Sequence, residues 1–190
     1  MKYPSGQFFQ TLEVKQSKFI AYLTPYFEYE HLLATLKEKH PKARHFVVAF
    51  RYLNEFEQIV EHSSDDGEPK GTSGKPSLMV LQGHELINIA VIIIRYFGGT
   101  KLGTGGLVRA YSDAVNLVIQ ESLFTEYKKE KELHIFVEYG NTRIIEYECE
   151  AAAIVIVKKV FSEGVEYFLR SSEENINSFR DKMQRIIKIY

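Results

Sequence analysis

The order of hydrophobic and polar residues divides the chain into strand-like and helix-like segments. Residues 8–13 and 18–24 are typical of two paired strands, and residues 29–39 carry leucines at helical spacing before a proline ends the helix. Residues 89–94 are six consecutive apolar residues. Such a run predicts a central strand, here over 88–97, that is buried on both faces.

The rest of the first 130 residues adds a hairpin, a polar loop and two helices. The segments are the hairpin strands 45–53 and 56–62 around Asn54-Glu55, the loop 63–74, a helix from Pro76 to Leu81 and a long amphipathic helix over 107–122. Beyond residue 131 the order is strand, helix, strand, strand, helix, strand. These segments are 132–139, 142–151, 154–161, 165–170, 173–184 and 186–190.

Residues 127–132 form a charged run between a glycine-rich first part and a second part with little glycine. We interpret the run either as the domain boundary or as an exposed strand that crosses it. The prediction is an α+β protein with domains over 1–130 and 131–190. The βαββαβ order of the second domain is the ferredoxin-like plan.

Composition narrows the class of protein. The 190 residues contain 24 Lys+Arg and 25 Asp+Glu, and 45% of them are hydrophobic, which excludes a disordered chain and a nonspecific polycation. No apolar run approaches the ~18 residues of a membrane helix, and the N-terminus lacks a signal-peptide core, so we expect a cytoplasmic protein without a membrane partner. The single cysteine, Cys149, excludes an intramolecular disulfide and a cysteine-cluster zinc site. We expect no metal and no cofactor.

A glycine-rich segment follows the predicted central strand and precedes a helix. Five glycines fall within nine residues: Gly98, Gly99, Gly103, Gly105 and Gly106. Glycine lets the backbone approach a bulky ligand, and the N–H groups at a helix start attract anions. With Arg95, Lys101 and Arg109 alongside, the pattern favours a phosphate-binding site. The alternative is that the glycines only permit tight packing.

The spacing of these glycines rejects two common phosphate motifs. A P-loop needs a lysine after its second glycine, but Thr104 follows Gly103 here. The dinucleotide fingerprint fails because Val108 occupies the position of its third glycine. Residues 69–109 nevertheless contain five basic residues and one acidic residue, a local balance of +4 in a nearly neutral protein.

The polar loop over 63–74, which we call the acidic loop, contains three carboxylates, Asp65, Asp66 and Glu68, within four residues. Adjacent carboxylates can ligate Mg²⁺ or act as an acid/base pair. Asp-Gly and Glu-Pro are also ordinary turn sequences, and we favour that structural role. A third interpretation is that these acids bond Arg or Lys of the glycine-rich segment and organise the anion site.

The histidines, serines and cysteine form no recognised catalytic set, and no catalytic residue is assigned. His62 and Ser63 are neighbours on a strand, so their side chains point to opposite faces. His45 and His62 would oppose each other across the hairpin, although a histidine pair on strands is more often part of the packing. Cys149 is interpreted as a core thiol.

Two long motifs resemble the IMPACT/YigZ family. Bacterial members carry a near-identical Ser-Asp-Asp-Gly-Glu-Pro-x-Gly-Thr-x-Gly loop, here residues 64–74. They also carry an Arg-Tyr-Phe-Gly-Gly-x-Lys-Leu-Gly-x-Gly-Gly-Leu-x-Arg-Ala-Tyr run, here residues 95–111. Residues 16–21 are similar to the family's N-terminal Lys-Ser-Lys/Arg-Phe-Ile-Ala. The resemblance covers essentially the whole chain.

The resemblance implies a ribosomal S5 domain 2-like fold for the first domain and a ferredoxin-like fold for the second. It also implies association with RNA or the ribosome and a role in translation or its regulation, without an established chemical activity. Many relatives have a His-His-Cys-like stretch where this chain has His45-Phe46-Val47, so no metal or thiol role is expected at that strand.

The function expected from these observations is the binding of RNA phosphates by a non-enzymatic protein. Arg95, Lys101, Arg109 and the backbone of 98–106 would contact phosphate, Tyr96 and Phe97 could stack bases, and the acidic loop would organise the site. The second domain would contact RNA or a protein partner. The alternative, by analogy with kinases of S5-like fold, is a Mg-dependent phosphotransferase or phosphohydrolase with Mg²⁺ on Asp65 and Asp66.

Overall fold

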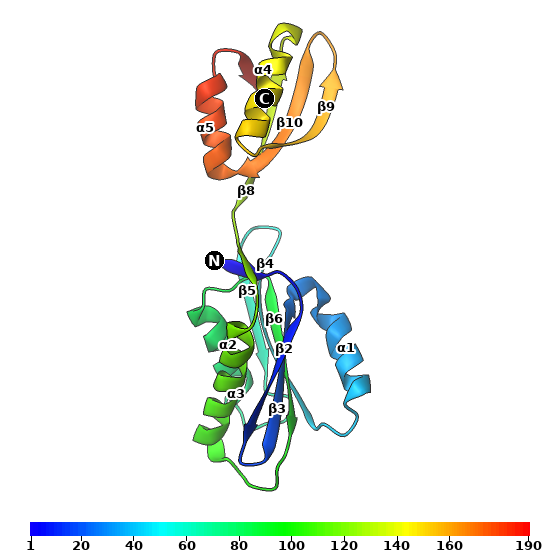
Figure 1. The fold of residues 1–190 in the computed structure, drawn as a ribbon, viewed down its shortest axis with the longest axis vertical. Coiled ribbons are helices and arrows are strands. Elements are labelled where there is room, and N and C mark those ends of the chain that lie inside the picture. The colour runs from blue at the N-terminus through cyan, green and yellow to red at the C-terminus, as the bar shows by residue number, and fades with distance from the viewer. The chain divides into compact units, whose positions relative to one another are not determined.

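In a computed structural model of residues 1–190, the chain divides into two compact units, Met1–Tyr127 and Lys128–Tyr190 (Figure 1). The chain is therefore a mixed α/β protein of two units. The division lies inside the charged run, three residues before the expected domain limit, and strand β8 (Glu130–Val137) also starts within that run. No helix in either unit has both the length and the hydrophobicity needed to cross a lipid bilayer.

The N-terminal unit is built on a five-stranded sheet with the order β2-β3-β6-β4-β5, in which all neighbouring strands are antiparallel. Its elements are β1 (Lys2–Pro4), β2 (Phe8–Val14), β3 (Ser17–Pro25), η1 (Tyr26–Glu28), α1 (Tyr29–Lys39), β4 (His45–Leu53), β5 (Ile59–Ser64), α2 (Gly74–Gly83), β6 (Ile89–Tyr96), α3 (Gly103–Gln120) and β7 (Phe124–Glu126). The long predicted helices and strands are all present.

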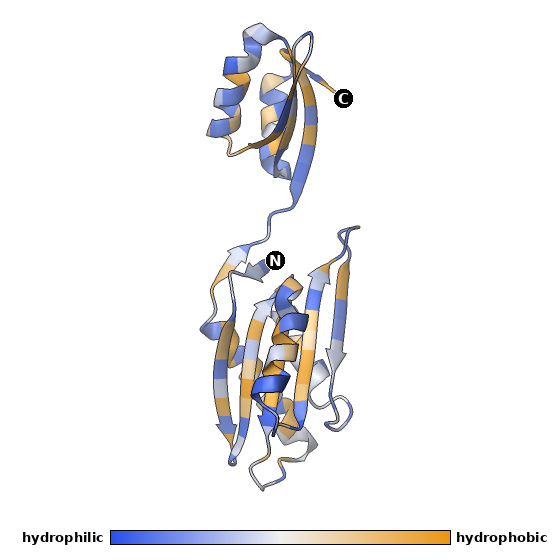
Figure 2. Cartoon of the chain, turned by 90° about the vertical axis from the view of Figure 1, so that its right-hand side faces the viewer, coloured by the Kyte–Doolittle hydropathy of each residue, from blue (hydrophilic) through white to orange (hydrophobic).

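Strand β6 is the central strand of this sheet and is buried on both faces, as predicted. Alternate side chains of a strand point to opposite faces. Val91 and Ile93 accordingly pack in the core with α2 and α3, whereas Ile92 and Ile94 pack in a smaller core with α1. Figure 1 shows α1 on one face of the sheet and α2 and α3 on the other, and Figure 2 shows the hydrophobic residues that alternate along the strands.

The hairpin between β4 and β5 is longer than predicted. Phe56 lies in the turn, and β5 begins only at Ile59. The Oδ1 atom of Asn54 accepts hydrogen bonds from the backbone N–H groups of Phe56 and Gln58, at 3.0 and 2.8 Å. Such local side-chain bonds compete with strand pairing and explain why the expected strand start at residue 56 is wrong.

A short strand pair, which we did not predict from the sequence, joins the first and last segments of the N-terminal unit. β1 and β7 are antiparallel, with Lys2 opposite Glu126. The pair is closed by a hydrogen bond of 3.0 Å from the Tyr127 N–H to the Met1 carbonyl. Strands of three residues carry too little periodicity to be recognised in a sequence.

The C-terminal unit is a four-stranded antiparallel sheet with the order β11-β8-β10-β9. The elements after β8 are η2 (Tyr139–Asn141), α4 (Thr142–Ala151), β9 (Val155–Phe161), β10 (Val165–Ser172), α5 (Glu173–Met183) and β11 (Ile187–Ile189), so the predicted βαββαβ order is present. Ile145 of α4 and Phe179 of α5 pack with Tyr167 in one core. Cys149 is buried there, and its burial raises the pKa of the thiol to about 11, which confirms a core thiol.

Replacing Gly98 with alanine should destabilise the N-terminal unit. A Cβ atom at this position would lie 2.0 Å from the carbonyl carbon of Gln16 and 2.2 Å from the amide nitrogen of Ser17. Both are backbone atoms that cannot rotate away. We expect Gly98→Ala to lower the free energy of unfolding by about 1–3 kcal/mol, measured by urea denaturation.

The matched control is Gly105→Ala, because a Cβ atom at Gly105 meets no atom within 4 Å and the residue lies inside α3. Alanine favours helices over glycine, so the free energy of unfolding should be unchanged or higher by up to about 1 kcal/mol. Equal losses in the two variants would contradict a specific close approach of residues 16–17 to Gly98.

Candidate functional site

The site residues predicted from the sequence come together at one end of the sheet of the N-terminal unit. The strand pairing brings the starts of β3 and β4 and the ends of β5 and β6 to this end. The acidic loop follows β5, and the glycine-rich segment follows β6. We call this region the glycine end; it consists of residues 15–18, 41–45, 64–74 and 95–109.

Glu68 and Arg95 form a buried ion pair at the glycine end. The Nη1 atom of Arg95 lies 2.6 Å from Oε1 of Glu68, and the two side chains are only 8% and 3% exposed. The hydroxyl of Tyr111 donates to the same carboxylate oxygen at 2.8 Å. Burial and the charge of Glu68 raise the pKa of Tyr111, so the phenol stays protonated and remains a donor.

Arg95 therefore lies below the surface and is paired with Glu68 of the acidic loop. This is the arrangement expected if the loop acids bond basic residues of the glycine-rich segment and organise the anion site. Its Nε atom is buried and has no hydrogen-bond partner. Arg95 also lines a cavity of about 390 Å³ together with Lys42, Arg44, His45 and the aromatic residues Tyr96 and Phe97. One donor of a buried guanidinium is thus unused beside a cavity with basic walls.

Asp65 acts as a cap for the start of α2. Its Oδ1 atom accepts hydrogen bonds from the N–H groups of Ser73 and Gly74 and from the Ser73 hydroxyl, at 3.1, 2.8 and 2.7 Å. Its Oδ2 atom accepts one from the N–H of Gly71, at 2.7 Å. Burial raises the pKa of the Asp65 carboxyl, but these bonds outweigh it and the pKa is lowered overall.

Asp66 joins the loop to the start of β4. Its Oδ2 atom accepts a hydrogen bond of 2.6 Å from the Phe46 N–H, and its carbonyl oxygen lies 2.8 Å from Nδ1 of His45. The acidic loop therefore uses its carboxylates for internal bonds. No three His, Cys, Asp or Glu side chains are grouped so that they could hold a metal ion.

The glycine-rich segment is more helical than predicted. We expected α3 to begin at Leu107, but it begins at Gly103, so Gly103, Gly105 and Gly106 lie in its first turn. No side chain caps this helix start, and its first turn contains no acidic residue. Its first N–H groups therefore lack a side-chain acceptor, and the partial positive charge of the helix is uncompensated.

The glycines of this segment serve different purposes. Gly98 is required by the backbone of residues 16–17, and its N–H donates to the Ser17 hydroxyl at 3.1 Å. Gly99 and Gly103 have positive φ angles of 87° and 73°. Gly105 is exposed, has no positive φ angle and has open space around it. The packing alternative therefore explains Gly98 but not Gly105.

The exposed cations of the glycine end have no acidic partner. Lys101 and Arg109 are exposed and take part in no ion pair. Arg109 lines a second cavity, of about 330 Å³, with Lys15 and Asp113 among its neighbours. The positive charges on this surface are therefore available to a ligand.

The histidine pair proposed from the sequence does not exist. In the strand register His45 lies opposite Arg95 of β6, whereas His62 lies opposite Phe50 of β4. The ring of His62 stacks on Phe50, with centroids 5.1 Å apart. The expectation that the two histidines face each other is wrong: a two-residue turn at Asn54-Glu55 would already place His62 opposite Val47, and the longer turn moves it to Phe50, further from His45.

The sequence did not point to Lys42 and Arg44, which the structure places beside Arg95. The available signal was two cations directly before a predicted strand. Their position depends on β4 pairing with β6, and this pairing joins strands that are about 40 residues apart in the sequence. Periodicity along the chain does not reveal such pairings.

Removing the Glu68 carboxylate should strongly destabilise the N-terminal unit, because Arg95 would then be a buried charge without a partner. We expect Glu68→Ala to lower the free energy of unfolding by about 3–5 kcal/mol, measured by urea denaturation. Lys70→Ala, an exposed change in the same loop, is the control and should cost less than about 0.5 kcal/mol. Similar losses in both variants would disprove the structural importance of the ion pair.

The stabilisation that Asp65 provides should disappear in acid. Its folded pKa lies below the ordinary value of 3.8, so its ionised form stabilises the fold above that pH and the gain is lost as the pH falls through the folded pKa. The difference in unfolding free energy between the wild type and Asp65→Asn should therefore be largest at about pH 6–7 and should shrink below about pH 3.8. Urea titrations across this range measure it; a difference independent of pH would contradict the prediction.

Comparisons with known proteins agree with the motifs that form the glycine end. Residues 15–119 match the family model of the Impact N-terminal domain. The chain is 37% identical over 175 residues to an IMPACT family member of Haemophilus influenzae, covering 90% of this chain and 84% of that protein. It is 31% identical over 176 residues to the IMPACT family member YvyE of Bacillus subtilis, covering 91% and 80%.

A solved structure also matches over both units. The crystal structure of a protein described as hypothetical has a TM-score of 0.67 to this chain at 27% sequence identity, and the match covers 99% of this chain and 95% of the other. The match to the family model and the identities to the two bacterial relatives together place the protein: this chain belongs to the IMPACT family.

Proposed function

We propose that this chain is a cytoplasmic, non-enzymatic protein that binds RNA or the ribosome and acts in translation or its regulation. The family relationship supports the link to translation, because a role in translation is what the resemblance to the IMPACT/YigZ family implies. The two motifs that carry this resemblance, residues 64–74 and 95–111, are also the segments that build the glycine end.

The observation that carries the proposal is a set of exposed cations at the glycine end that form no ion pair. Lys42, Arg44, Lys101 and Arg109 are exposed and form no ion pair. The nearby carboxylates of the acidic loop are occupied by backbone N–H groups and by Arg95, so they do not neutralise these cations. Exposed cations of this kind supply most of the affinity of proteins for nucleic-acid backbones.

The start of α3 supports a phosphate contact beside these cations. Lys101 lies two residues before Gly103, the first residue of the helix, and Arg109 lies about two turns further along the chain. The absence of a side chain at Gly105 leaves the first N–H groups open, so a phosphate oxygen could approach them closely. We therefore propose that the backbone of residues 98–106 and these two cations bind one stretch of RNA backbone.

The cavity beside Arg95 supports the binding of a nucleotide rather than of phosphate alone. Phe97 is 57% exposed at its rim, and Cζ of Arg95 lies 5.7 Å from the centroid of the Phe97 ring. An exposed ring next to basic side chains can stack a base while the cations neutralise its phosphate.

The C-terminal unit has a sheet face that suits a similar role. His134 and Phe168 stack with centroids 4.1 Å apart on the face opposite the helices, and Nζ of Lys158 lies 5.4 Å from the Phe168 ring. We propose that this unit contacts RNA or a protein partner. We also propose the S5 domain 2-like fold for the N-terminal unit and the ferredoxin-like fold for the C-terminal unit, where the strand order β11-β8-β10-β9 supports the assignment.

No specific observation favours the alternative of a Mg-dependent phosphotransferase or phosphohydrolase. That mechanism would need free carboxylate oxygens on Asp65 and Asp66. Both oxygens of Asp65 and one oxygen of Asp66 instead accept hydrogen bonds from the backbone. These bonds give both residues a structural role.

A salt titration of RNA binding tests the proposal. We expect the affinity of the full chain for a short structured RNA to fall steeply with salt, because bound cations release counterions from the RNA. In the double variant Lys101→Ala/Arg109→Ala the slope of log K against log salt should become shallower by about 1.4–1.8, the value for two lost phosphate contacts. Fluorescence anisotropy with labelled RNA measures both slopes.

The control variant is Lys2→Ala, which removes one exposed cation from the opposite end of the same unit. Its salt slope should equal that of the wild type. The absence of wild-type binding to RNA and to ribosomal subunits at moderate salt would overturn the proposal. An equal loss of slope in Lys2→Ala would show that binding depends on net charge and not on the glycine end.

A further inference from the structure

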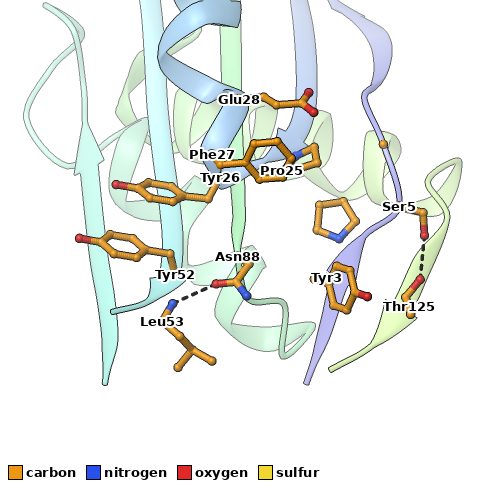
Figure 3. Close-up of a pocket in the computed structure, with 12 residues that line it drawn as sticks. Tyr3, Ser5, Pro25, Tyr26, Phe27, Glu28, Tyr52, Leu53, Asn88 and Thr125 are labelled. Atoms are coloured by element: carbon orange, nitrogen blue, oxygen red, sulfur yellow. Dashed lines mark hydrogen bonds between the residues drawn. The ribbon is translucent and has the colours of Figure 1, made fainter. Parts of the chain in front are cut away.

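A third cavity lies at the end of the same sheet that is opposite the glycine end, where β3 and β4 end and β6 begins (Figure 3). Its volume is about 610 Å³, larger than the about 390 Å³ of the cavity beside Arg95. We call it the aromatic pocket; its walls include Tyr3, Tyr26, Phe27, Tyr52 and the carboxylate residue Glu28. Neither the sequence motifs nor the proposed RNA site involves these residues.

The aromatic rings form a preassembled wall. Tyr26 and Tyr52 stack in parallel, with centroids 4.0 Å apart and an angle of 6° between the rings. Figure 3 shows this pair on one side of the pocket and Tyr3 on the other, with Phe27 between them at the rim. Burial and, to a smaller extent, the hydrogen bond with Tyr52 raise the pKa of Tyr26 to about 12, so this ring remains neutral. The faces of neutral aromatic rings attract cations.

Charge at this end also favours a cation. Glu28 is the only charged residue that lines the pocket. Its Oε2 atom accepts a hydrogen bond of 2.6 Å from Gln7, and its other oxygen has no partner. Glu30, Glu55 and Glu85 are exposed around the same end of the sheet and add further negative charge there. The one nearby lysine, Lys2, lies opposite Glu126 in the β1–β7 pair.

We propose that the aromatic pocket binds the arginine side chain of a partner polypeptide. A guanidinium group is flat, so it can stack on the rings of Tyr3 or Phe27 while its edge donates to the free oxygen of Glu28. The ammonium group of lysine has no plane to stack and is more strongly hydrated. The pocket is large enough for residues that flank the arginine. This inference goes beyond the proposed RNA binding and does not depend on it.

Binding of short capped peptides to the full chain tests this proposal. The probe is Gly-Arg-Gly, and the matched controls carry citrulline, lysine or leucine in place of arginine. Citrulline has the shape of arginine without its charge. In two-dimensional NMR spectra the arginine peptide should shift the backbone signals of Phe27 and Asn88. The citrulline peptide should bind about 3- to 30-fold more weakly, the combined effect of one cation–π contact and one exposed ion pair.

Two variants locate the contact. Glu28→Gln removes the carboxylate charge, and Phe27→Ala removes a ring that is 83% exposed and therefore adds little to stability. Each should weaken binding of the arginine peptide about 2- to 5-fold. The control is Glu38→Gln, which makes the same charge change on an exposed residue near the end of α1. Glu38 lies about 15 Å from Glu28 along the helix axis, so this variant should bind the arginine peptide like the wild type.

Three results would overturn the proposal. Equal binding of the leucine or citrulline peptide would identify the pocket as a general apolar groove. Equal binding of the lysine peptide would show that charge alone, and not a guanidinium group, is recognised. Signal shifts confined to residues outside the aromatic pocket would place the arginine elsewhere on the acidic surface. Loss of RNA binding in the Lys101→Ala/Arg109→Ala variant has no bearing on any of these outcomes.

Discussion

The buried ion pair between Glu68 and Arg95 is the interaction on which the glycine end depends. It joins the loop after β5 to the central strand, and the Tyr111 hydroxyl adds α3 to the same carboxylate oxygen. Removing two charges from water is costly, and the pair offsets that cost only with good geometry and further hydrogen bonds. Because the acid is used internally, the cations around it remain uncompensated at the surface. One buried contact thus shapes both the fold and the charge of this region.

The elements could be predicted from the sequence where the periodicity was long, and the site could be predicted only in part. Helix α1 and strand β4 have the predicted limits, since a proline and a long apolar pattern mark them. The predicted start of α3 at Leu107 was wrong because glycines usually indicate loops, whereas here they lie in the first turn of the helix. The burial of Arg95 and its neighbours Lys42 and Arg44 follow from pairing between distant strands, which no local pattern contains.

The N-terminal unit carries opposite charge at the two ends of its sheet. Unpaired lysines and arginines surround the glycine end, whereas Glu28, Glu30, Glu55 and Glu85 surround the other. A polyanion is attracted to one end and repelled from the other, so the approach of this unit to such a partner is oriented before any contact forms. The nearly neutral net charge of the whole chain conceals this separation, because composition averages over it.

The β1–β7 pair has a mechanical consequence. The chain enters this unit at Met1 and leaves it at Tyr127, and these two residues lie side by side because the Tyr127 N–H donates to the Met1 carbonyl. The two short strands are antiparallel, and Met1 and Tyr127 lie at the same end of the pair. Tension between these two residues would therefore break the hydrogen bonds between the strands one after another. A bond that opens alone resists less force than several that must shear together. The first three strand residues are therefore the point at which a pull on the chain would begin to open this unit.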